Sequence, residues 1–163
     1  MNRAVIGLGT NLGDRMGSLR AAVKSLALLP GTSVARCSSI YQTAPVGLTS
    51  QPYFFNCAVA IETALSARAL LGACLGIEAA MGRVRAEKNG PRVIDLDLLF
   101  YEGVRCCDAE LTLPHPRIPE RLFVLVPLRE LFPGGEALGF PFDTHQAPDE
   151  RVELFCAPQR LLS

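Results

Sequence analysis

Two aspartates at alternate positions of an apolar stretch are the residues best suited to chemistry. Asp95 and Asp97 lie in Val93–Tyr101 (VIDLDLLFY), which has the apolar and β-branched character of a strand. Side chains alternate between the two faces of a strand, so both carboxylates point the same way, about 7 Å apart, while Leu96 and Leu98 point into the core. Oxygen ligands without a neighbouring Cys or His favour Mg²⁺, and two carboxylates can hold two such ions.

A basic segment leads directly into this strand. It reads RVRAEKNGPR, and its positive side chains are Arg83, Arg85, Lys88 and Arg92. Four positive charges against the single acid Glu87 give a net charge of +3, whereas the whole chain has sixteen basic and sixteen acidic residues. Arginine pairs bidentately with phosphate, so the combination predicts a site for a metal-bound polyphosphate. The alternative is a solvated basic loop beside two exposed acids of an edge strand.

Composition and motifs exclude several classes of protein. The 163 residues, 49% of them hydrophobic, fit one domain, residues 1–163, with an apolar core. The balanced charge argues against a nucleic-acid partner, and no apolar run approaches the roughly 20 residues that cross a membrane. The early glycines (GLGTNLG) match neither the dinucleotide fingerprint nor the P-loop. The start has no signal-peptide pattern and the six cysteines have no zinc-binding spacing, so we expect a cytoplasmic protein with reduced thiols. We also expect a monomer.

The elements that must position these side chains follow from hydrophobic periodicity and from the turn residues. The predicted order is strand Arg3–Gly9, a helix capped by Asp14 and ending near Leu29, strands Thr32–Tyr41 and Phe54–Thr63, a helix capped by Ser66 and ending near Met81, strand Val93–Tyr101, a weaker strand Arg105–Ala109, and a helix Pro119–Leu131. This order favours an α+β fold: a ferredoxin-like βαββαβ sheet with its helices packed on one face, plus an extra β-hairpin and a C-terminal helix. The long link Gln42–Tyr53 is typical of a binding loop.

The second predicted helix carries a carboxylate on its apolar side. Glu78 is at helical spacing from Leu71, Cys74 and Leu75, so it falls on the stripe that should be buried. A buried carboxylate needs a partner, and a nearby arginine of the basic segment would provide one.

The segment Lys88–Leu99 (KNGPRVIDLDLL) resembles the signature of the 6-hydroxymethyl-7,8-dihydropterin pyrophosphokinases, a family of folate-pathway enzymes. Five further blocks occur in the order of that family, and together they cover nearly the whole chain. They are GLGTNLGDR at Gly7–Arg15, YQTAPVG at Tyr41–Gly47, QPYFFN at Gln51–Asn56, GRVR at Gly82–Arg85 and LTLPHPRIPERLFVLVPL at Leu111–Leu128.

The resemblance implies transfer of the pyrophosphoryl group of ATP, the co-substrate, to the hydroxymethyl oxygen of the pterin, giving AMP and the pterin diphosphate. It implies that Asp95 and Asp97 hold two Mg²⁺ ions and that Arg83 and Arg92 stabilise the transferring phosphates. The residues that it implies around ATP are Glu78, Arg83, Arg85, Arg92, Leu98, Thr112, His115 and Arg121. Those that it implies around the pterin are Thr43, Ala44, Val46, Phe54, Asn56 and Phe123.

Three positions depart from the pattern of some relatives. Asn89 stands where a Trp can occur, Glu110 where a basic residue can occur, and Pro116 where an aromatic residue can occur. They bear on ATP affinity and leave the two aspartates unchanged. Two other functions use the same residues: a nonenzymatic nucleotide-binding module, and a metal-dependent phosphohydrolase that activates water in place of the pterin.

Overall fold

The computed structural model describes residues 1–44, 50–83, 91–143 and 151–162. Its main sheet is built around β1 (Asn2–Thr10), which pairs antiparallel with β4 (Phe54–Thr63) on one side and with β5 (Asp95–Tyr101) on the other. β4 pairs in turn with β2 (Thr32–Cys37) and β3 (Ile40–Thr43), both antiparallel. This arrangement confirms the predicted ferredoxin-like order of strands and helices.

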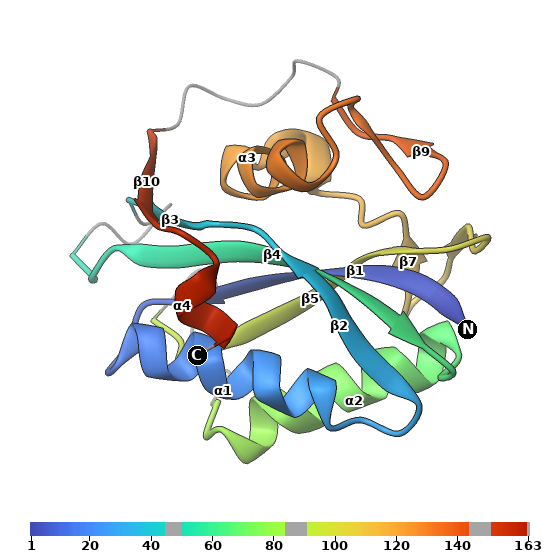
Figure 1. The fold of residues 1–163 in the computed structure, drawn as a ribbon, viewed down its shortest axis with the longest axis horizontal. Coiled ribbons are helices and arrows are strands. Elements are labelled where there is room, and N and C mark those ends of the chain that lie inside the picture. Colours follow the sequence, from blue (N-terminus) through green and yellow to red (C-terminus); the bar gives the residue numbers. More distant parts are fainter. Residues whose placement is uncertain (45–49, 84–90, 144–150, 163) are drawn as a thin grey trace.

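Two helices cover one face of the sheet (Figure 1). They are α1 (Arg15–Ala27) and α2 (Ala67–Ala80). Each begins after a side chain that accepts a hydrogen bond from a first-turn amide, which satisfies one of the free N–H groups of a helix start. Asp14 accepts from the N–H of Gly17 at 3.0 Å, and Ser66 accepts from the N–H of Ala69 at 3.2 Å. Both predicted caps and the placement of both helices on one face are confirmed.

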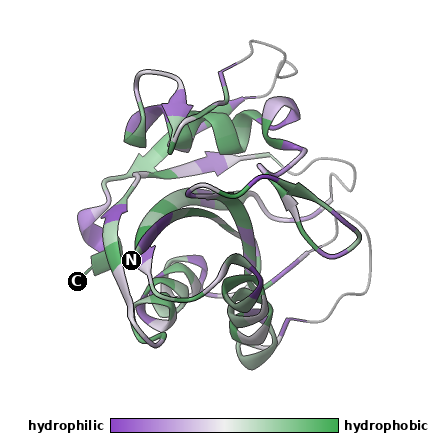
Figure 2. Ribbon diagram, turned by 90° about the vertical axis from the view of Figure 1, so that its right-hand side faces the viewer, coloured by the Kyte–Doolittle hydropathy of each residue, from purple (hydrophilic) through white to green (hydrophobic). Residues whose placement is uncertain are grey.

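The opposite face of the sheet is only partly covered. Helix α3 (Leu122–Leu131) and a small hairpin of β8 (Glu136–Ala137) and β9 (Phe140–Pro141) pack on it (Figure 1). Figure 2 shows hydrophobic residues concentrated in the central strands, between the two helical layers. The part of this face that α3 and the hairpin leave open is where β1 and β5 carry their glycines and aspartates.

An irregularity in the β1–β5 ladder separates the apolar and polar parts of this face. The register shifts between Val5 and Ile6, whose partners in β5 are Phe100 and Leu98. The extra residue, Leu99, therefore faces the same cluster as Phe100, beneath α3. On the other side of the shift the alternation is regular, and it directs Asp95 and Asp97 to the face opposite the buried Leu96 and Leu98.

Some predicted strands differ in their bounds. The predicted strand Thr32–Tyr41 is divided into β2 and β3, because Ser38 interrupts it and bonds with both its main chain and its hydroxyl to Ala58 of β4. The strand predicted from Val93 begins at Asp95, since the carbonyls of Val93 and Ile94 accept hydrogen bonds from the side chains of Thr10 and Arg83. The weaker strand predicted at Arg105–Ala109 is shorter, and pairs as β6 (Cys106–Cys107) with β7 (Thr112–Leu113) to form the extra hairpin.

The C-terminal third departs further from the prediction. The helix predicted from Pro119 is a 3₁₀ turn, Ile118–Glu120, followed by α3, because Arg121 between them has an extended backbone with φ of −120°. The last thirty residues give little sequence signal beyond several turns, and they contain β10 (Val152–Cys156), which extends the sheet beyond β3, and the short helix α4 (Gln159–Leu162). Their short, mixed patterns carry little periodic signal. Within the described residues, no helix has both the length and the apolar content needed to span a membrane.

Candidate active site

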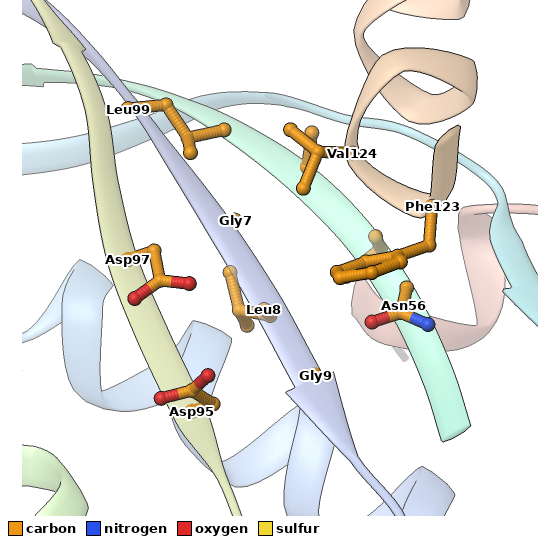
Figure 3. Close-up of a pocket in the computed structure, with 11 residues that line it drawn as sticks. Gly7, Leu8, Gly9, Asn56, Asp95, Asp97, Leu99, Phe123 and Val124 are labelled. Atoms are coloured by element: carbon orange, nitrogen blue, oxygen red, sulfur yellow. The ribbon is translucent and has the colours of Figure 1, made fainter. Parts of the chain in front are cut away.

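The floor of the site is a row of glycines on the open face of the sheet. Gly7 pairs with Asp97 in β5, and Gly9 pairs with Asp95 in β5 and with Asn56 in β4. Because neither glycine has a side chain, nothing from β1 separates the carboxylates from Asn56 (Figure 3). A Cβ atom on Gly9 would lie 2.9 Å from the Oδ1 atom of Asn56, which is too close for an unshifted side chain.

Both aspartates point into this space from β5 (Figure 3), and guanidinium groups surround them unequally. Asp95 forms ion pairs with Arg83 and with Arg92, the latter at 3.1 Å. Among the described residues Asp97 has one ion pair, with the Nη1 atom of Arg121 at 3.7 Å. The carboxylates are partly buried, with 19% and 32% of their side chains exposed.

The unequal surroundings shift the pKa values of the two carboxyl groups in opposite directions. Burial by itself would raise the pKa of Asp95, but the charges of Arg83 and Arg92 outweigh it and lower that pKa below its ordinary value. Burial, followed by the charge of Asp95, raises the pKa of Asp97 to about 6, and Arg121 only partly offsets this. The site therefore has an excess of negative charge at Asp97, which a cation would relieve.

A buried carboxylate of α2 supports the same strand. Glu78 is 3% exposed, and its Oε2 atom accepts a hydrogen bond from the N–H of Leu96 at 2.9 Å. The same oxygen is 3.3 Å from the Nη1 atom of Arg83, so the expected arginine partner is confirmed. Burial, together with the nearby Asp95, raises the pKa of Glu78 to about 7, although the bond from Leu96 opposes this. Glu78 joins α2 to the start of β5 and to Arg83.

Two phenylalanines lie beside the arginines that pair with the carboxylates. Phe123, in the first turn of α3, points toward Asn56 (Figure 3). The guanidinium carbon of Arg121 lies 5.5 Å from the centre of its ring, and that of Arg92 lies 5.4 Å from the ring of Phe54. Each of these arginines therefore links one phenylalanine to one aspartate. The amide of Asn56 donates to the hydroxyl of Thr43 at 2.8 Å, which orients its oxygen toward the floor of the site.

A wider groove opens on the other side of Asp97. Its volume is about 380 Å³, and its lining includes Asp97, Leu98, Thr112 and His115. Asp97 also lines the space that contains Asn56 and Phe123, so this one carboxylate lies at the junction of the two cavities. A molecule in the groove and a second one beside Phe123 would meet there.

The polar and apolar walls of the groove have distinct origins. Burial, followed by the charge of Arg121, lowers the pKa of His115 to about 4, so its ring is neutral at pH 7. Its Nδ1 atom accepts from the N–H of Arg117 at 3.2 Å, which leaves the proton on Nε2. Leu71 and Leu75 of α2 were expected in the core, but they line this groove, and Leu75 is 44% exposed. Helical spacing alone does not distinguish a core stripe from a binding wall.

Residues 5–133 match the model of the 7,8-dihydro-6-hydroxymethylpterin-pyrophosphokinase (HPPK) family. The chain belongs to this family. It is 51% identical over 142 residues, 85% of its length, to the 2-amino-4-hydroxy-6-hydroxymethyldihydropteridine pyrophosphokinase of Methylorubrum extorquens, and covers 90% of that protein. It is 45% identical over 130 residues to the enzyme of the same name from Bacillus subtilis, with 80% of this chain and 78% of the relative covered.

Solved structures share the fold. A crystal structure of HPPK-DHPS in complex with substrates superposes with a TM-score of 0.63 at 15% sequence identity, over 86% of this chain. The chain spans 43% of that longer protein. This likeness to a protein that is distant in sequence supports the fold of the present chain.

The structure brings most of the predicted HPPK site residues together and leaves some outside its description. Asp95, Asp97, Arg83, Arg92 and Arg121 form one cluster of charges, as the ion pairs show. Those beside the floor or in the groove are Thr43, Phe54, Asn56, Phe123, Glu78, Leu98, Thr112 and His115. Ala44 is exposed directly after β3 and lines neither of the two cavities. Val46, Arg85, Lys88 and Asn89 lie outside the described residues.

Sequence reasoning missed the part that the early glycines play in this HPPK site. The segment GLGTNLG excludes two nucleotide-binding loops and belongs to a block of the family resemblance, but neither observation gives its glycines a place in the site. Alternation along the predicted strand contains the missing signal, because it places Gly7 and Gly9 on the face opposite the apolar Ile6 and Leu8. A strand with glycines at successive positions of one face indicates a close approach by another group.

Proposed function

We propose that this member of the HPPK family transfers the pyrophosphoryl group of ATP to 6-hydroxymethyl-7,8-dihydropterin and that Asp95 and Asp97 are its metal-binding centre. The hydroxymethyl oxygen forms a bond to the β-phosphorus of ATP and loses its proton. The bond from that phosphorus to the bridging oxygen breaks, and AMP leaves with the oxygen. The single observation that carries the proposal is the position of Asp97, which lines both the pterin-side space and the nucleotide-side groove.

The aspartates suit Mg²⁺ in a particular way. They supply oxygen ligands on one face of β5, and the described residues contain no group of three or more His, Cys, Asp or Glu side chains fit to hold a metal. Magnesium is commonly held by one or two carboxylates, with substrate phosphates and water as its other ligands. When bound, two Mg²⁺ ions would polarise the transferring phosphoryl group and neutralise charge on the leaving AMP.

The arginines then serve the phosphates. Arg83 and Arg92 lie beside Asp95, and Arg121 lies beside Asp97, so three guanidinium groups approach the place where a triphosphate would bind. The Nε atom of Arg83 is buried and has no hydrogen-bond partner among the described residues. A phosphate oxygen would satisfy this donor, since buried polar groups in proteins are seldom left unpaired. We assign Arg83 and Arg92 to the stabilisation of the transferring group.

The pterin is assigned to the space between Phe54 and Phe123. A planar ring gains about 1 kcal/mol per aromatic wall beyond the burial of its area. The Asn56 amide presents both a donor and an acceptor to the polar edge of the ring, and Gly9 leaves room for that edge. Thr43 borders the same side of this pocket through its bond to Asn56, and the resemblance to the family adds Ala44 and Val46.

ATP is assigned to the groove that contains Leu98, Thr112 and His115. The adenine would contact the apolar wall provided by Leu71 and Leu75, while the Nε2–H of the neutral His115 donates to a phosphate or ribose oxygen. Asp108 and Glu110 at the edge of the groove form ion pairs with Arg68 of α2. These pairs offset the negative charge of the two carboxylates, which would otherwise repel the triphosphate. Arg85 completes this set by resemblance to the family. We propose that the enzyme acts as a monomer.

One assay separates this function from its alternatives. The full chain is incubated with ATP, Mg²⁺ and the hydroxymethyl dihydropterin, and AMP is measured with and without the pterin. We expect AMP and the pterin diphosphate in equal amounts, and only when the pterin is present. AMP or phosphate without the pterin would identify a phosphohydrolase. Binding of ATP without any product would identify a nucleotide-binding module.

A further inference from the structure

A buried amide directly behind the site joins segments from three parts of the chain. Asn11, the first residue after β1, is 1% exposed. Its Nδ2 atom donates to the Oε1 atom of Gln51 at 2.9 Å and to the carbonyl of Pro52 at 3.0 Å. Its Oδ1 atom accepts from the N–H of Arg92 at 2.9 Å, and its own N–H donates to the carbonyl of Arg92 at 3.1 Å. The nitrogen and the oxygen of the Asn11 side chain and its main-chain N–H therefore all form hydrogen bonds.

The segments that Asn11 joins lead to opposite sides of the reaction. Gln51 and Pro52 lead into β4 two residues before Phe54, a proposed wall of the pterin pocket. Arg92 leads into β5 three residues before Asp95, a proposed metal ligand. Asn11 itself lines neither of the two cavities, so it reaches the substrates only through these segments.

Arg92 is the residue whose position depends most directly on Asn11. Both hydrogen-bonding groups of its main chain bond to Asn11, one to the side chain and one to the backbone. Its guanidinium in turn donates to Asp95 at 3.1 Å and lies over Phe54. Removal of the Asn11 amide would take a partner from the part-buried N–H of Arg92, from the buried side chain of Gln51 and from the carbonyl of Pro52, and the chain would move to compensate.

We propose that Asn11 is a positioning residue of the transfer reaction, one that holds Arg92 in register with both Phe54 and Asp95. The proposal rests on the function proposed above. Asn11 does not touch ATP or the pterin; it fixes the distance between the pterin wall and the guanidinium that faces the phosphates. A displacement of about 1 Å at a positioned group can cost roughly 100-fold in rate.

A double-mutant cycle tests the proposal. The variants are Asn11→Ala, Arg92→Ala and the double variant, with kcat and both KM values measured well below the melting temperature of each. We expect Asn11→Ala to lower kcat about 100-fold in the wild-type background and less than about 3-fold in the Arg92→Ala background, since residues that act together are not additive. Equal factors in the two backgrounds would overturn the proposal, because a purely structural effect does not depend on Arg92.

The matched control is Asn2→Ala, at the other end of the same strand. Asn2 is exposed, and its amide donates to the hydroxyl of Tyr101 at 3.2 Å, far from the site. The Asn2→Ala variant should leave kcat unchanged. Should Asn11→Ala fail to fold, Asn11→Asp replaces it in the cycle, because it keeps an acceptor for Arg92 and loses the donor to Gln51 and Pro52.

A second readout keeps this proposal separate from the proposed function. The cycle is repeated on the affinity for Mg²⁺ with α,β-methylene-ATP, measured by calorimetry, which needs no turnover. A wild type that binds this analogue, but forms no AMP when it is given ATP and the pterin, would contradict the proposed function alone. Additive losses of affinity in the cycle would contradict the role of Asn11 alone, and non-additive losses would support it.

Discussion

Asp95 and Asp97 lie on the same side of β5, but Asp95 is paired with two guanidinium groups and Asp97 has one at 3.7 Å. The pKa of Asp95 is lowered and that of Asp97 is raised to about 6. Two adjacent carboxylates therefore differ in charge balance before any ligand binds. Asp97, which has the weaker compensation, is also the residue that both cavities share.

The Asp97→Asn variant should separate activity from stability. We expect turnover to fall at least about 1,000-fold, because a proposed metal ligand and its charge are lost. Stability without ligands should rise instead. The folded-state pKa of about 6 is above the ordinary value of 3.8, so between these pH values the stability of the wild type falls as pH rises.

The stability of Asp97→Asn relative to the wild type should therefore increase from about pH 4 and level off above pH 6, at about 1–2 kcal/mol after allowance for solvent screening. Urea unfolding in EDTA at a series of pH values measures this difference. A melting temperature that falls in parallel with activity would show that Asp97 has a structural role.

Replacement of Glu78 by Gln should destabilise the protein less than replacement by Ala. Glu78→Gln keeps an oxygen that can accept from the N–H of Leu96, whereas Glu78→Ala leaves that buried donor unpaired at a cost of about 1–3 kcal/mol. Since the pKa of Glu78 is raised to about 7, its protonated form predominates at pH 6, and the Gln variant should unfold at nearly the same urea concentration there. Equal destabilisation by both substitutions at pH 6 would contradict the hydrogen bond as the main contribution.

Gly9→Ala should act on the pterin through Asn56. The new Cβ atom would lie 2.9 Å from the Oδ1 atom of Asn56, so the amide must move. Loss of a well-aligned hydrogen bond to the pterin should raise its KM about 10-fold, while the melting temperature and the affinity for ATP change little. Gly7→Ala is the comparison: its Cβ atom would be 3.3 Å from a methyl group of Leu99, which can yield, so the KM for the pterin should rise less. The opposite ranking would refute this account of the floor.

His115 should contribute as a neutral donor at every pH between 5 and 8. Its pKa of about 4 and the bond that its Nδ1 atom accepts leave the proton on Nε2. We expect His115→Ala to raise the KM for ATP about 10-fold, and His115→Gln, whose amide N–H can replace Nε2–H, to raise it less than about 3-fold. The ratio of kcat/KM between wild type and His115→Gln should be constant from pH 5 to 7. A ratio that changes near pH 6.5 would show that the imidazolium form takes part.

The local features of this site were predictable because they depend on one element at a time. The alternation of a strand places Asp95 and Asp97 together, and helical spacing places Glu78 on the buried side of α2. Asp14 and Ser66 mark helix starts through bonds to amides three residues away. Each of these relationships spans a few residues, so backbone geometry is enough to establish it.

The limits of prediction lie where packing determines the outcome. The extended backbone at Arg121 divides a helix that periodicity makes continuous, and this break directs Arg121 toward Asp97 and Phe123. Leu75 has the spacing of a core residue but lines the groove beside Asp97. Periodicity identifies the apolar side of a helix, and only the neighbouring elements decide whether that side is covered.

The sequence by itself determined the family, the order of the strands and helices as far as β5, and the shared orientation of the two carboxylates. Only the tertiary structure decided that Gly9 leaves open the space between Asp95 and Asn56, and that Asn11 ties Arg92 to the segment before Phe54. The reason is that side-chain alternation is a property of each strand, whereas the register of β1 with β4 and with β5, which are far away in the chain, is set by the packing of the whole sheet.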